Sequence, residues 1–93
     1  MTIDWKKEAA NRKDDFIADL VELLKIDSVR DDSKATTDAP VGPGPKEALE
    51  AFLALGERDG FVTKNVGNLA GHIEYGAGDE TMGVFAHVDV VPV

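Results

Sequence analysis

Residues 81–92 read TMGVFAHVDVVP, and this stretch decides the fold that we expect. Its first half is a nearly continuous apolar run, which is typical of a strand that is covered on both faces. The apolar residues of this half are Met82, Val84, Phe85 and Ala86. Pro92 cannot donate to a ladder, so pairing should fade there. The sequence therefore predicts a buried strand over 81–91.

Two polar residues, His87 and Asp89, stand at the far end of this run. Side chains alternate along a strand, so these two should point to one side and Val88 and Val90 to the other. Ligands of open α/β sheets bind at the carboxyl ends of strands. The pattern therefore predicts a candidate site at the tip of this strand.

An imidazole at such a position is a candidate zinc ligand, because histidine commonly binds metals through one ring nitrogen. Its other N–H usually needs a carboxylate or a carbonyl to fix the tautomer. Asp89 could be that partner of His87, or it could bind the metal directly. The pattern also fits a plain histidine that is satisfied by a neighbouring aspartate in an ordinary strand.

Two helices are expected before this strand. Residues 4–26 carry apolar side chains at spacings of mostly three, four and seven, so they predict one long amphipathic helix capped by Asp4. One side of this helix should be buried against something larger. A second helix should begin at Pro45 and end at Asp59-Gly60.

The connection over 27–44 is polar and rich in glycine and proline. It has neither a strand nor a helix period. A connection of this length inside a compact domain is usually functional or mobile. A plain surface loop is an equally good interpretation.

Two further β-prone runs cover 61–66 and 69–75. The flexible turn over 76–80 predicts a hairpin between 69–75 and 81–87. In its simplest register His72 would lie about 10 Å along the strand from His87, on the opposite face. We interpret His72 as a surface or packing residue.

Composition narrows the function classes. The 93 residues carry a net charge of −8 and no cysteine. The acidic balance disfavours nucleic acid and anionic membrane surfaces as partners. The lack of cysteine excludes disulfides and thiolate metal sites. The N-terminus has no apolar signal-peptide core, and no stretch approaches the length of a membrane span, so we expect a cytoplasmic protein.

Helices mixed with β runs predict an α/β layer structure with two helices and about three strands. A chain of this length allows one domain at most. Its oligomeric state is left open by the sequence.

The segment 83–92 resembles the first metal motif of the zinc aminoacylase, carboxypeptidase and dipeptidase family. The similarity extends along most of the chain and favours the bacterial dipeptidases of the PepV type. It includes the segments 24–28, 44–49, 58–61 and 68–76.

This resemblance implies a dinuclear-zinc metallopeptidase that hydrolyses dipeptides with a free N-terminus. It implies that His87 binds one of two zinc ions and that Asp89 is a catalytic residue that orients this histidine. A short peptide is the implied substrate. A lid domain and a glutamate general base belong to the same family pattern.

The other acidic and histidine ligands of the family follow the position of Pro92. By resemblance, residues 1–93 are the N-terminal portion of the catalytic domain, without the lid domain and the rest of that domain. We expect this piece to be inactive alone, because a catalytic zinc typically needs three protein ligands. An aminoacylase, a desuccinylase or a tripeptidase of the same fold remains an alternative. A non-enzymatic acidic interaction domain is another.

Overall fold

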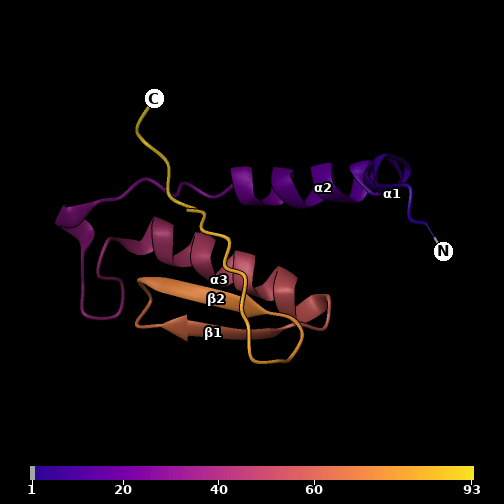
Figure 1. Cartoon of the computed structure of the whole chain (residues 1–93). Coiled ribbons are helices and arrows are strands. Elements are labelled where there is room, and N and C mark those ends of the chain that lie inside the picture. Colours follow the sequence, from indigo (N-terminus) through magenta and orange to yellow (C-terminus); the bar gives the residue numbers. More distant parts are fainter. Residues whose placement is uncertain (1) are drawn as a thin grey trace.

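The computed structural model describes residues 2–93, which form helices and one β-hairpin (Figure 1). The elements are α1 (Trp5–Asn11), α2 (Lys13–Leu24), the 3₁₀ helix η1 (Asp32–Lys34), α3 (Pro43–Arg58), β1 (Val62–Val66) and β2 (Ala70–Glu74). Helix α3 lies between the hairpin and α2, as Figure 1 shows. The mixed α/β class expected from the sequence is confirmed.

The helix expected over 4–26 is interrupted at Arg12, so the prediction of one continuous helix was wrong. Asp4 caps the first turn as predicted, with its carboxylate accepting from the Lys7 amide at 3.1 Å. The Arg12 amide then bonds to the Ala9 carbonyl at 3.2 Å, which is a tightened turn. Residues 11–15 are all polar or charged, so no apolar side chain packs there to hold the helix continuous.

The apolar side of α1 and α2 is exposed, although the sequence suggested burial. No residue of either helix is buried. The side chain of Phe16 is 67% exposed and that of Leu24 is 69% exposed. Helix α2 lies against α3 as well as against its neighbour α1.

Helix α3 begins two residues before the predicted Pro45, at Pro43. Both prolines are tolerated, because amides in the first turn of a helix have no intrahelical partner. The helix ends at Arg58. Gly60 then adopts a φ of 87°, as its predicted role in the helix stop requires.

The small core lies between α3 and the hairpin. Its buried apolar residues are Ala39, Ala48, Leu49 and Leu53. Glycine allows close approach at two points. A Cβ on Gly71 would lie 3.0 Å from Leu53 Cδ1, and one on Gly56 would lie 2.9 Å from Ile73 Cδ1. The helix therefore sits directly on the backbone of β2.

The hairpin pairs β1 with β2 in antiparallel register, so the predicted pairing of 69–75 with 81–87 is wrong. Gly67 and Asn68 take φ values of 63° and 57°, and the Leu69 amide donates to the Val66 carbonyl at 3.2 Å. Such left-handed turns match the twist of paired strands. Lys64, and not a residue of 81–87, lies near His72 across the ladder.

The segment 81–91 is not a buried strand, which corrects the expectation that decided the fold. It forms one parallel bridge, between Val90 and Val29, and its trace passes in front of α3 in the view of Figure 1. Val84 is 84% exposed and Phe85 is 99% exposed. Within residues 2–93 no strand runs beside most of this segment, and a strand without partners is not stable in water.

Among the helices of residues 2–93, none is both long enough and apolar enough to cross a bilayer.

Candidate metal-binding site

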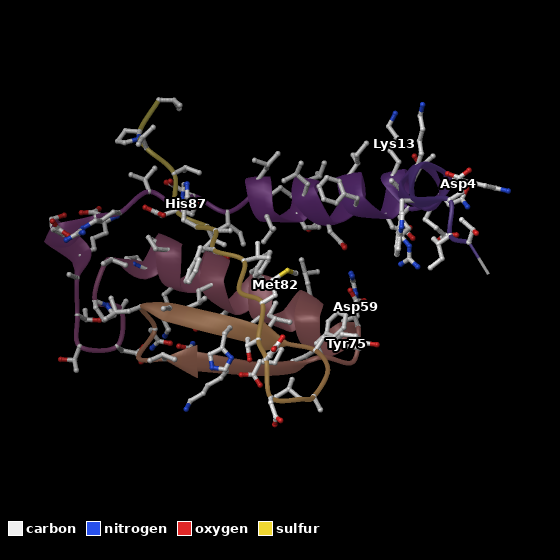
Figure 2. All side chains as sticks on the ribbon, viewed as in Figure 1. Asp4, Lys13, Asp59, Tyr75, Met82 and His87 are labelled. Atoms are coloured by element: carbon white, nitrogen blue, oxygen red, sulfur yellow. The ribbon has the colours of Figure 1, made fainter. Side chains whose placement is uncertain are left out.

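The two predicted site residues lie together. The Nδ1 atom of His87 is 2.9 Å from the Asp89 backbone oxygen and 3.1 Å from Asp89 Oδ1. The His87 side chain is 82% exposed and projects from the C-terminal segment 81–93 (Figure 2). The expected proximity therefore arises from a local side-chain contact and not from strand alternation.

The geometry at His87 fixes which ring nitrogen is free. Both atoms that face Nδ1 are oxygens of Asp89, a carbonyl and a carboxylate, and both are acceptors. In the neutral ring, Nδ1 must therefore carry the hydrogen, which leaves the lone pair on Nε2. Within residues 2–93, Nε2 has no hydrogen-bond partner. An imidazole that is held by its N–H and open at its lone pair is what a metal-binding histidine requires.

The site segment is attached to the rest of the fold by one backbone contact. The Val90 amide donates to the Ser28 carbonyl at 3.2 Å, beside the bridge between Val90 and Val29. Ser28, which accepts this bond, is 3% exposed. This attachment places His87 and Asp89 next to residues 28–30.

A cation lies near Asp89. The pKa of Arg30 is raised, mainly by its hydrogen bond to Asp32 at 2.8 Å and in smaller part by the charge of Asp89. The Arg30 guanidinium therefore adds positive charge on the Asp89 side of the pair. Sequence reasoning missed both Arg30 and Ser28, because no spacing rule relates residues 28–30 to 87–90.

The pair is one candidate ligand with its orienting partner and does not make a complete metal site. No group of three or more His, Cys, Asp or Glu side chains in residues 2–93 is arranged to hold a metal. The donor chemistry fits zinc, since imidazole nitrogen is one of its usual ligands. Further ligands would have to come from outside these residues.

His72 forms a similar pair at the surface. Its Nδ1 lies 3.3 Å from Glu74 Oε1, and its side chain is 47% exposed. The surface interpretation of His72 is thus correct, although the register used to reach it was wrong. Lys64, directly across the ladder, disfavours a cation here. The His72 and Glu74 pair is therefore a matched comparison for His87 and Asp89.

No family model matches the chain. It is similar to curated bacterial proteins named "Putative dipeptidase". The Staphylococcus epidermidis protein (strain ATCC 12228) is 54% identical over 88 residues, and that of Staphylococcus aureus strain USA300 is 51% identical over 88 residues. In both comparisons the match covers 95% of this chain and 19% of the relative. The chain thus spans about a fifth of the length of the relatives that it matches.

Proposed function

We propose that the chain is the N-terminal portion of the catalytic domain of a dinuclear-zinc dipeptidase. Relatives at 51% and 54% identity carry the name dipeptidase, and this supports a peptidase. The observation that carries the metal assignment is the position of both Asp89 oxygens at Nδ1 of His87, which leaves Nε2 free. We refer to the longer protein as the parent protein.

In this proposal His87 holds one zinc ion through Nε2, and Asp89 fixes the tautomer and orientation of the ring. The negative charge of Asp89 also makes the imidazole a stronger ligand. When bound, the zinc ions would supply Lewis-acid chemistry at the peptide carbonyl. The general base and the other ligands belong to the part of the parent protein outside residues 1–93.

The proposed substrate is a dipeptide with a free N-terminus, hydrolysed in the cytoplasm. The names of the relatives support a dipeptide. An aminoacylase, a desuccinylase or a tripeptidase of the same fold would use the same histidine. A panel of dipeptides, tripeptides and N-acyl amino acids, assayed on the parent protein, separates these activities. The proposal requires that dipeptides are hydrolysed with the highest kcat/KM.

The metal is tested with the parent protein and a dipeptide that the panel identifies as a substrate. A chelator should abolish the release of free amino acids, and added zinc should restore it. His87→Ala should remain inactive after zinc is added. The matched control, His72→Ala, should behave as the wild type. Activity that resists the chelator, or an active His87→Ala variant, would contradict the proposal.

A further inference from the structure

The first turn of α3 lies directly against the backbone of Asp27 and Ser28. A Cβ on Gly44 would lie 1.9 Å from the Asp27 carbonyl oxygen and 3.4 Å from Ser28 Cα. The first distance is far below van der Waals contact, and the obstructing atom belongs to the backbone. No residue other than glycine fits this position without displacing the segment.

Space, and not backbone conformation, is the reason for glycine at this position. The glycines with positive φ in residues 2–93 are Gly42, Gly60, Gly67, Gly76 and Gly78, and Gly44 is not among them. Gly44 is the second residue of α3, and alanine is a better helix former than glycine. The close contact with Asp27 therefore outweighs the ordinary preference of the helix.

The same short segment holds the candidate metal site. The carbonyl of Ser28, one residue beyond the contact with Gly44, accepts the Val90 amide at 3.2 Å. Together with the parallel bridge between Val90 and Val29, this bond joins the segment 81–93 to residues 28–30. Val90 directly follows Asp89. A shift of Ser28 would therefore move the carboxylate that holds the His87 ring.

We propose that Gly44 is a positioning residue for His87 and Asp89. Its lack of a side chain lets Asp27 and Ser28 pack on α3, and the Ser28 carbonyl then fixes the site segment through the Val90 amide. The effect on zinc rests on the proposed function, whereas the effect on the Val90 amide does not.

The first test compares hydrogen exchange at the Val90 amide in the wild-type parent protein with that in Gly44→Ala. Loss of the bond to Ser28 should raise the exchange rate about two- to tenfold. The amides of β1 and β2 serve as an internal reference and should keep their protection. Gly83→Ala is the matched control, because its Cβ would approach nothing closer than 3.8 Å, at Phe85. In this control the Val90 amide should exchange at the same rate as in the wild type.

A second pair of variants tests the link even if Gly44→Ala fails to fold. Val90→Pro removes the amide donor, whereas Val90→Ala keeps it. Val90→Pro should lower the zinc affinity of the parent protein about tenfold relative to Val90→Ala, as loss of an orienting contact around a metal ligand does. The affinity is measured by competition with a zinc chelator.

Two results would overturn the inference. One is unchanged exchange at Val90 in a folded Gly44→Ala variant. The other is equal zinc affinity of Val90→Pro and Val90→Ala. If the wild-type parent protein binds no zinc, the proposed function fails, and faster Val90 exchange in Gly44→Ala would still support the positioning link. The two failures are therefore distinguishable.

Discussion

At the scale of single residues, His87 and Asp89 show how much a short motif can determine locally. The side chain of His87 turns back along its own segment to reach the Asp89 carbonyl and carboxylate. This contact spans two residues and needs no sheet. The two side chains lie together as the sequence led us to expect, although the strand that was expected to carry them is absent from residues 2–93.

In the proposed site, the Asp89 carboxylate contributes to the zinc affinity of His87. Asp89→Asn in the parent protein should weaken zinc binding about tenfold, the lower end of the usual effect for such partners. The loss is limited because the Asp89 backbone carbonyl, 2.9 Å from Nδ1, still holds the ring. The affinity is measured by titration against a competing chelator.

The matched control for this substitution is Glu74→Gln, which removes the same kind of partner from His72. It should leave the zinc affinity unchanged. Equal losses in Asp89→Asn and Glu74→Gln would show that the effect is not specific to the proposed site.

Asn68 stabilises the hairpin turn through its backbone conformation and its side chain. Its φ of 57° is left-handed, which costs an alanine about 1–2 kcal/mol. Its side-chain amide also donates to the Asp38 carbonyl at 2.7 Å, which ties the turn to the 27–44 connection. Asn68→Ala should therefore lose more stability than Asn68→Gly, which loses only the side-chain contacts. Unfolding of the parent protein in denaturant measures both, and the reverse order would contradict the role of the turn.

At the scale of elements, a bidentate ion pair connects α2 to α3. Arg58 donates to both carboxylate oxygens of Asp19, at 2.9 and 3.0 Å, and it also contacts Asp59 at 3.0 Å. The hydrogen bond from Arg58 lowers the pKa of Asp19 below its ordinary value of 3.8. The pair is exposed to solvent, so its contribution is small.

The lowered pKa of Asp19 determines how the stabilising effect of this ion pair changes with pH. A carboxylate whose pKa is lower in the folded state stabilises the fold above its unfolded value and loses that effect as the pH falls. Asp19→Asn should therefore lower the denaturation midpoint at pH 7, and this difference should shrink as the pH falls from about 4 through the lowered pKa. Denaturant unfolding of both proteins across this range measures it. A difference that stays constant with pH would contradict the charge interaction.

The elements differ in how well the sequence predicted them. The cap at Asp4 and the stop at Gly60 depend on local chemistry and were predicted correctly. The pairing predicted for 69–75 was wrong, because the hairpin was assigned to the glycine-rich turn over 76–80. The observed turn at Gly67-Asn68 is itself a known hairpin signal, which the prediction did not use. Alternation alone cannot select the partner of a strand.

The contacts around the site could not be predicted for a similar reason. Ser28 and Gly44 act through backbone contacts between residues that are far apart in sequence. No periodicity or motif in one chain relates such positions. Only the tertiary arrangement brings the 27–30 segment between α3 and the site.

At the scale of the whole molecule, residues 2–93 are extended and bury little apolar surface. The radius of gyration is 15.7 Å, whereas a compact chain of this length has about 12 Å. Large apolar side chains on α1, α2 and the segment 81–93 are exposed. We propose that other parts of the parent protein cover them.

This proposal predicts the behaviour of the isolated piece. Residues 1–93 expressed alone should bind a hydrophobic dye and melt without a sharp transition, because the core between α3 and the hairpin is small. The parent protein should bind much less dye under the same conditions. A cooperative melt of the isolated piece without dye binding would instead support a self-sufficient interaction domain.

The most direct measurement is anomalous X-ray scattering at the zinc edge from crystals of the zinc-loaded parent protein. The account predicts a peak about 2.0–2.1 Å from Nε2 of His87, the usual zinc–nitrogen distance, with Nδ1 still facing Asp89. No zinc peak at His87, or a peak at Nδ1 in place of Nε2, would contradict it.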